Sequence, residues 1–173
     1  MQKEFPHDLL AEKSLVGCLI IDGSAFDEIS DLKIRRDDFY DSRYGMLFEA
    51  ISDLAMANKP VDYVTACSRL KEKGFLEPVG GENFVTSILD DMASSANIYH
   101  YAKTVKEKSA LRRILKTAMQ VYEQGMSHTG DVKEYLQEVE GKFFKLTNEA
   151  KTGGMGKLNS FLKANLLELE DTS

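Results

Sequence analysis

The sequence predicts an all-α protein, and three observations support that fold class. Apolar residues recur at helical spacing through most of the 173 residues, and no segment alternates apolar and polar residues over the length of a strand. Aspartate, asparagine, glycine and proline stand between the periodic segments, where helices begin and end. The stretch from Asn97 to Ser127 has no proline, and its only glycine is Gly125. We expect a compact bundle of short helices followed by a long antiparallel helical hairpin and a tethered linker helix.

The first 96 residues should form the bundle. Asp8 and Asp62 each precede a periodic apolar segment and are suitable N-caps, because their carboxylates can accept from backbone N–H groups of the first turn. The expected helices cover residues 8–22, 42–58, 63–73 and 82–92, with a short helix around Phe26 and Ile29 and a loop at 74–81. The side chains expected in the core include Leu9, Val16, Leu19, Ile20, Phe39, Tyr40, Val64, Cys67 and Leu70.

The long stretch from Asn97 carries two apolar stripes that point in different directions. At roughly 100° per residue, the second stripe is turned by about a third of a revolution from the first. The polar run from Lys106 to Ser109 separates them. The first should pack on the bundle and the second on the segment Asp131–Ala150, while Val121 lies off the second stripe. The first stripe is Ile98, Tyr101, Ala102 and Val105, and the second is Leu111, Ile114, Leu115, Ala118, Met119 and Tyr122.

The returning arm should begin with Asp131 as its N-cap and complete an αα-hairpin, because only a short turn connects two amphipathic helices. Its stripe is Val132, Tyr135, Leu136, Val139, Phe143 and Leu146. Phe144 and Gly141 do not fit a simple pair of helices. They indicate either an exposed surface that tolerates such residues or a second packing face that a partner covers. The candidates for the hairpin and dimer interface are Tyr122, Tyr135, Leu136, Val139, Phe143 and Phe144.

The predicted domain organisation has four parts. Residues 1–96 form the bundle, 97–150 the hairpin, 151–157 a glycine-rich flexible linker and 158–173 the linker helix. A helix this short is marginal alone, so its apolar face needs a surface to lie on. We favour another chain over the protein's own core. The face consists of Leu158, Phe161, Leu162, Leu166 and Leu169.

Composition excludes several classes of function. The net charge of −6 and pI near 5.2 argue against a protein that holds DNA by charge. The basic run Lys103–Lys116 is expected to be a solvated face, with a contact to an acidic partner or DNA as the alternative. There is no phosphate-binding GxxxxGK[ST] loop and no catalytic constellation, so we expect no catalytic, metal or cofactor site. Cys18 and Cys67 should be buried free thiols. No segment resembles a membrane span or signal peptide, which indicates a cytoplasmic protein.

Two alternatives come from other classes. A small DNA-binding module could use Asp62–Met92 as a helix-turn-helix, although the acidic charge opposes it. An enzyme with a pocket hidden from sequence inspection is the second alternative. The surplus apolar faces instead favour a domain for assembly and partner binding.

Several runs resemble the DnaB-type bacterial replicative DNA helicases. PHDLLAEKSLVGCLIID matches the opening pattern P-x-x-x-x-A-E-x-x-(L/V)-(L/V)-G of that family. KPVDYVTACSRLKEKGFLEPVGG resembles the next block, SSANIYHYAKTVKEKSALRRILKTAMQVYEQG the long hairpin helix, and FFKLTNEAK the return arm. The resemblance runs in order from about Pro6 to the end. It implies the N-terminal domain and linker helix of such a helicase.

The family supplies further expectations. Hairpins would pair into dimers, and three dimers would form the collar of a hexameric ring that recruits primase. The linker helix would dock on the motor domain of a neighbouring subunit. A helicase loader is a further candidate partner, and DNA contact would be weak or indirect. The ATPase motor, with its ATP and magnesium, is expected to follow and is absent from this sequence, so the chain itself should not be an enzyme. Residues carried over by motif as primase contacts are Phe84, Leu115 and Val121.

Overall fold

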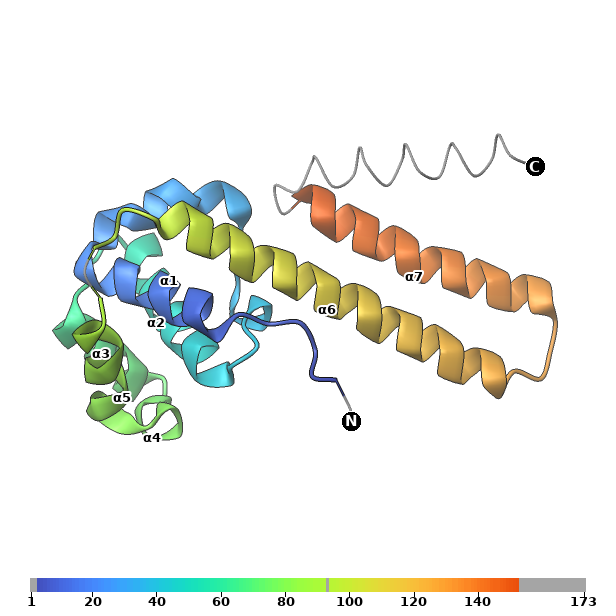
Figure 1. The fold of residues 1–173 in the computed structure, drawn as a ribbon, viewed down its shortest axis with the longest axis horizontal. Coiled ribbons are helices and arrows are strands. Elements are labelled where there is room, and N and C mark those ends of the chain that lie inside the picture. The colour runs from blue at the N-terminus through green and yellow to red at the C-terminus, as the bar shows by residue number, and fades with distance from the viewer. Residues whose placement is uncertain (1–2, 93, 153–173) are drawn as a thin grey trace. The chain divides into compact units, whose positions relative to one another are not determined.

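The computed structural model describes residues 3–92 and 94–152, and in this part of the chain all regular elements are helical (Figure 1). The predicted all-α class is confirmed. The chain divides into two compact units, residues 1–109 and 110–173. The elements are α1 Leu9–Ile21, the 3-10 helices η1 Gly23–Leu32 and η2 Arg36–Asp38, α2 Ser42–Met56, α3 Tyr63–Glu72, α4 Leu76–Val79, α5 Gly81–Asp90, α6 Ile98–Met126 and α7 Val132–Thr152.

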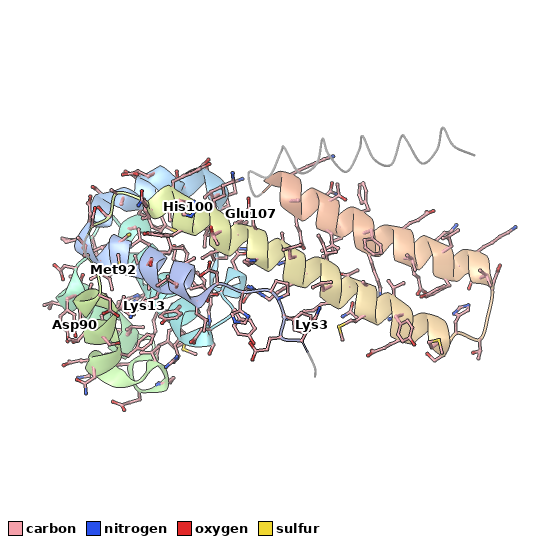
Figure 2. All side chains as sticks on the ribbon, in the orientation of Figure 1. Lys3, Lys13, Asp90, Met92, His100 and Glu107 are labelled. Carbon is pink, nitrogen blue, oxygen red and sulfur yellow. The ribbon has the colours of Figure 1, made fainter. Side chains whose placement is uncertain are left out.

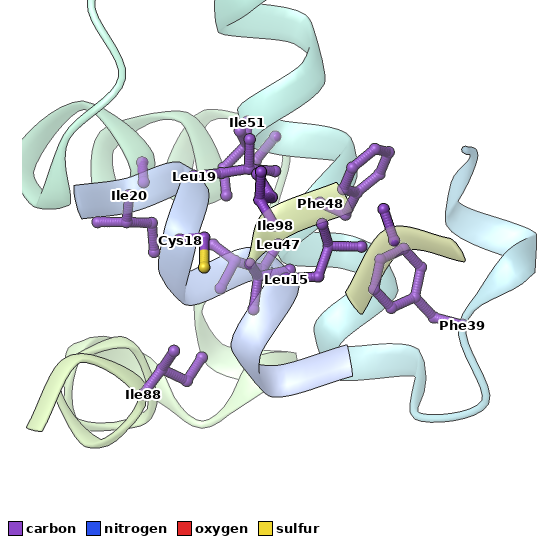
Figure 3. Packing of buried hydrophobic residues seen from close by; sticks show 14 of the residues in the cluster. Leu15, Cys18, Leu19, Ile20, Phe39, Leu47, Phe48, Ile51, Ile88 and Ile98 are labelled. Atoms are coloured by element: carbon purple, nitrogen blue, oxygen red, sulfur yellow. The ribbon is translucent and has the colours of Figure 1, made fainter. Parts of the chain in front are cut away.

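Helix α1 is the centre of the first unit. Nearly every residue from Ala11 to Ile20 is buried, so this helix is packed against neighbours on all sides rather than on one face. Gly17 lets α5 approach closely, because a Cβ there would lie 2.8 Å from the Met92 side chain. Lys13, one turn earlier and labelled in Figure 2, pairs with Asp91, the residue that follows α5. The large, fully buried side chains on and around α1 include Leu15, Leu19, Leu47, Phe48, Ile51 and Ile98 (Figure 3).

The predicted N-caps are confirmed in the bundle. An Asp8 carboxylate oxygen accepts from the backbone N–H of Ala11 at 2.9 Å, and Asp62 accepts from that of Thr65 at 2.9 Å. The Thr65 hydroxyl oxygen accepts in return from the backbone N–H of Asp62, which completes a capping box. Both cysteines are buried and free, as predicted, and burial raises the pKa of each thiol.

Four predictions about the bundle were wrong in detail. Leu9 and Val64 are exposed at 41% and 70%, because each lies at the first turn of its helix, before the chain enters the core. Tyr40 is also exposed and stacks on the ring of His7, with 4.1 Å between the centroids. The predicted loop at 74–81 contains α4, a single turn too short to show helical periodicity.

A buried glutamate organises the start of α2. Glu12 on α1 is only 2% exposed, and its two carboxylate oxygens accept from the backbone N–H groups of Tyr40 and Asp41, each at 3.1 Å. Asp41 then caps α2 by accepting from the N–H of Arg43. Burying a carboxylate costs free energy unless it is hydrogen-bonded. Glu12 therefore fixes the position of the chain that enters α2.

Gly45 offers a test of packing in the bundle. A Cβ at this position would lie 2.8 Å from the backbone carbonyl oxygen of Arg36, which cannot turn aside as a side chain can. Gly45→Ala should lower the free energy of unfolding by about 1–3 kcal/mol, through overpacking. Gly141→Ala is the matched control, because a Cβ there meets open space in mid-helix and should stabilise by up to about 1 kcal/mol. Urea unfolding measures both, and a Gly45→Ala variant as stable as wild type would contradict this account.

An ion network joins α2 and α3 and makes stability depend on pH. Asp53 accepts from Arg69 at 2.7 Å and from Lys73 at 2.9 Å, and Lys73 also pairs with Glu49 at 3.0 Å. Partial burial raises the pKa of Asp53, but these hydrogen bonds outweigh it and hold that pKa below its ordinary 3.8. The pKa of Glu49 is likewise held below its ordinary 4.5 against the opposing effect of burial, by Lys73 and Arg36.

A depressed carboxylate pKa stabilises the fold above the unfolded-state pKa and loses that effect as the pH falls through the folded-state pKa. The melting temperature should therefore fall on acidification below about pH 4. Asp53→Asn should be less stable at pH 7 and show a shallower acid decline, whereas Asp27→Asn on the exposed side of η1 should follow wild type. Parallel wild-type and Asp53→Asn curves would exclude this contribution.

The boundary between the units lies inside α6 rather than at its start. Ile98, Ala102 and Val105 are buried in the core of the first unit, as predicted for the first stripe. The sequence division at residue 97 followed the start of the helix, but the compact unit extends to Ser109. At the other end, α7 continues through Thr152, two residues into the predicted linker. Residues 153–157 and the predicted linker helix, with Leu158, Phe161, Leu162, Leu166 and Leu169, lie outside the described residues.

Candidate assembly surface on the helical hairpin

The second unit contains an antiparallel hairpin of the rest of α6 with α7. Asp131 caps α7 by accepting from the backbone N–H of Lys133 at 2.9 Å, as predicted. The Tyr135 hydroxyl donates to the backbone carbonyl of Val121, and Gly125 leaves room for this hydroxyl. Nearer the bundle end, Arg113 pairs with Glu149 at 3.5 Å. The half-buried contact face consists of Ile114, Thr117 and Val121 on α6 and Tyr135, Val139 and Leu146 on α7.

The second apolar stripe of α6 does not pack on α7 as predicted. Except for the half-buried Ile114, its members are exposed along the helix, and the contact with α7 uses a face about a third of a turn away. Helical periodicity showed that the stripe is continuous but could not show which neighbouring face the return arm would cover. The exposed stripe contains Leu111 (45%), Leu115 (42%), Met119 (52%), Tyr122 (69%) and Met126 (73%).

Helix α7 divides its broad apolar stripe in the same way. Tyr135, Val139 and Leu146 are half-buried against α6, whereas Val132, Leu136 and Phe143 are exposed at 70%, 54% and 39%. Counted in the direction of increasing residue number, the exposed residues lie about a third of a turn beyond the contact face on α6 and about a sixth of a turn beyond it on α7. Because the helices run antiparallel, this displacement points to one side of the hairpin. We call these eight exposed apolar residues of α6 and α7 the hairpin face.

Phe144 and Gly141 lie apart from the hairpin face. Phe144 is 65% exposed and, by helical geometry, points away from α6. A Cβ on Gly141 would meet open space, so within the described residues this glycine does not serve close helix packing. The two accounts of these residues, a tolerant surface or a second packing face, both remain compatible with this placement.

The polar run between the stripes of α6 is a buried cluster. Lys106 is 8% exposed, and its ammonium group donates to Asp38 and to the carbonyl oxygen of Lys33, both at 3.1 Å. Asp38 is 1% exposed and also accepts from the Ser109 hydroxyl at 2.8 Å and the backbone N–H of Arg35 at 2.8 Å. We call Asp38, Lys106 and Ser109 the buried cluster.

The prediction of a solvated basic face was therefore wrong at two positions. Lys106 belongs to the buried cluster, and Arg112 is only 6% exposed. A basic residue between two apolar stripes looks solvated in sequence. Only the folded chain shows that an acid from a distant connector, Asp38, reaches Lys106. The spacing of the run from Lys103 to Lys116 gave no signal of this partner.

The three candidate primase contacts differ in their surroundings. Phe84 on α5 is half-buried, packs on Tyr44 with 5.5 Å between centroids, and lies under the Arg43 guanidinium at 5.0 Å. Leu115 belongs to the exposed hairpin face. Val121 is half-buried in the contact between α6 and α7, so the exposed apolar spot expected there is absent.

Other kinds of site find little support in the described residues. No group of three histidine, cysteine, aspartate or glutamate side chains there is placed to hold a metal ion. An open hollow of about 530 Å³ lies between η1 and the loop after α2, and its ionisable lining residues are Asp27 and Lys59. Helix α5, which lies in the segment of the alternative DNA-binding module, carries no lysine or arginine. None of the described helices combines the length and apolar character needed to cross a membrane.

Comparisons with known proteins agree with this architecture. The replicative DNA helicase DnaC of Bacillus subtilis is 32% identical over 157 residues, which are 91% of this chain but 34% of the helicase. The replicative DNA helicase DnaB of Geobacillus stearothermophilus is 28% identical over the same length and coverage. The chain thus spans about a third of the length of these curated relatives.

The solved N-terminal domain of DnaB helicase from Mycobacterium tuberculosis superposes with a TM-score of 0.77 at 28% identity, over 82% of this chain and 99% of that one. A second solved structure, of a DnaB-like replicative helicase and its interactions with primase, shares the fold at a TM-score of 0.65 and 19% identity. The family model described as DnaB-like helicase N terminal domain matches residues 4–107, more than half of the sequence. The chain belongs to the family of DnaB-like helicase N-terminal domains.

Proposed function

We propose that this chain is a non-catalytic assembly domain of a replicative DNA helicase, which associates with itself through the hairpin face and recruits primase. The hairpin face is the observation that carries this proposal. It consists of eight exposed apolar side chains that helical geometry places on one side of two helices. Large exposed apolar patches mark interaction surfaces, because water is released when they are covered.

The expected occupant of the hairpin face is a second copy of the same hairpin. The half of the hairpin near its turn, residues 118–142, is acidic, and the other half, residues 110–117 and 143–152, is basic. In an antiparallel pair, the acidic half of one copy would lie on the basic half of the other. The acidic half has Glu123, Asp131, Glu134, Glu138 and Glu140 against Lys133 and Lys142; the basic half has Arg112, Arg113, Lys116, Lys145 and Lys151 against Glu149.

This orientation makes a charge-exchange prediction at the edge of the face. By helical geometry, Lys116 and Glu123 border the exposed stripe of α6 on the same side. Lys116→Glu should weaken self-association a few-fold, because an exposed ion pair contributes roughly 0.2–1 kcal/mol. Adding Glu123→Lys should restore wild-type affinity in an antiparallel pair. Analytical ultracentrifugation measures both dissociation constants, and a double variant weaker than Lys116→Glu would argue for parallel pairing.

Higher assembly belongs to the same proposal. Dimers would combine in threes to form a collar on a hexameric ring in the cytoplasm, and the segment from Leu158 would dock on a neighbouring motor domain. ATP- and magnesium-dependent unwinding would belong to the two thirds of the relatives that this chain does not match. A helicase loader is a further proposed partner, with DNA contacts weak or indirect.

Primase is the partner that we propose for the outer surface of the collar. The DnaB-like replicative helicase that interacts with primase shares the fold with this chain, which supports the choice of partner. Phe84 is the proposed contact on the bundle, where the Arg43 guanidinium, itself paired with Asp41, lies over the aromatic ring. Leu115 would serve primase only in copies whose hairpin face is not already paired. Val121 is the weakest of the three proposed contacts because it is half-buried in the hairpin.

The proposal is tested by mass and by binding. Light scattering of the 19.4 kDa chain should give about twice that mass at high concentration and fall towards the monomer on dilution. Titration with the primase of the same organism should show binding, and Phe84→Ala should weaken it. Phe75 is a half-buried aromatic residue elsewhere on the bundle, so Phe75→Ala should leave primase binding unchanged. A strictly monomeric chain would contradict self-association, and absence of primase binding would contradict recruitment.

A further inference from the structure

We propose that Met119 and Met126 make the hairpin face sensitive to peroxides, so that their oxidation to sulfoxides dissociates the assembled domain. This inference rests on the proposed self-association. The two thioethers are 52% and 73% exposed in the single chain, and both lie in the exposed stripe of α6 with Leu115 and Tyr122 between or beside them. They are therefore reachable by a small oxidant in the free chain and covered by a second copy in the pair.

The chemistry needs only hydrogen peroxide as co-reactant. A sulfur lone pair attacks one peroxide oxygen, the O–O bond breaks, and the products are one methionine sulfoxide and one water molecule. The thioether is oxidised by two electrons and the peroxide is reduced by two. The new S=O group replaces an apolar contact by a strong acceptor, which the apolar partner surface cannot satisfy. Reduction of the sulfoxide by methionine sulfoxide reductases would restore the face.

The other described methionines provide internal controls. Met56, the last residue of α2 in the bundle, is 77% exposed, which is as accessible as Met126, but it lies outside the hairpin face. Met46 and Met92 are half-buried in the bundle. Oxidation of Met56 should therefore proceed at a similar rate without affecting assembly. The placement of Met119 and Met126, rather than their exposure alone, distinguishes them.

The first measurement is the rate of oxidation at different protein concentrations, by peptide mass spectrometry. If the second copy covers the hairpin face, Met119 and Met126 should be oxidised several-fold more slowly above the dissociation constant than below it. Met56 should be oxidised at the same rate throughout. Equal rates for Met119 and Met126 at all concentrations, in a protein that light scattering shows to be dimeric, would overturn the inference.

The second measurement is affinity after oxidation. Wild-type protein with both thioethers oxidised should show a dissociation constant raised at least about tenfold. Met119→Leu with Met126→Leu should keep its affinity after the same treatment, whereas Met56→Leu should lose affinity as wild type does. A fully oxidised wild type that remains dimeric, or a double leucine variant that dissociates equally, would overturn the inference. An untreated wild type that is already monomeric would instead overturn the proposed self-association on which the inference rests.

Discussion

Leu136→Glu is expected to convert the self-associating domain to a monomer over the micromolar concentration range. Leu136 lies near the middle of the hairpin face and is 54% exposed, so the free chain tolerates a charge there. In the pair, the carboxylate would be buried against the apolar side chains of a second copy, without a hydrogen-bond partner. Truncating or charging a central interface residue typically costs about 2–4 kcal/mol, which weakens the dissociation constant by roughly 30- to 1,000-fold. Sedimentation equilibrium measures this change.

The matched control for this prediction is Gln137→Glu. It introduces the same charge one residue away, at an exposed position off the hairpin face, and should leave the dissociation constant within about twofold of wild type. Circular dichroism and melting temperature should show that both variants fold. If Leu136→Glu remains dimeric while folded, the hairpin face is not the site of self-association.

Tyr135 is a less informative target than the sequence suggested. Its hydroxyl donates to the Val121 carbonyl across the hairpin, so a charge at Tyr135 would damage the hairpin itself. Phe144 is exposed and separate from the hairpin face, and Phe144→Glu tests the second packing surface instead. Dissociation by Phe144→Glu with assembly retained in Leu136→Glu would move the interface to the other side of α7.

The sequence predicted the elements whose signals are local. Asp8, Asp62 and Asp131 were identified as caps because each precedes an apolar periodic segment, and each carboxylate accepts from a first-turn N–H group. The hairpin followed from two long amphipathic segments joined by a short turn. By contrast, α4 is one turn long and carries no periodic signal.

The sequence could not show how broad apolar stripes are divided between neighbours. The stripe of α7 covers nearly a third of the helix circumference, and periodicity alone does not separate Tyr135, which faces α6, from Leu136, which is exposed. Glu12 and Asp38 were missed for a different reason. An acid in an amphipathic segment or a connector is normally solvated, and its burial depends on partners 28 and 68 residues away.

The buried cluster should make Asp38→Asn one of the most destabilising substitutions in the bundle. Asp38 accepts from Lys106, Ser109 and the backbone N–H of Arg35, and thereby fixes the connector around η2 to the first half of α6. Removing its charge leaves the Lys106 ammonium group buried at 8% exposure without its counter-charge. Breaking one side of a buried ion pair costs about 3–5 kcal/mol.

Urea unfolding should therefore show a large fall in the midpoint for Asp38→Asn, whereas Asp37→Asn, its exposed neighbour, should stay within about 0.5 kcal/mol of wild type. Lys106→Met, which keeps the apolar stem but removes the charge, should also destabilise, because the Asp38 carboxylate then loses the Lys106 ammonium group. The double variant should be more stable than the sum of the two single losses predicts, since neither charge remains to be buried alone. Strictly additive losses would show that Asp38 and Lys106 do not act as a pair, and that their attraction is not what makes the buried cluster stabilise the bundle.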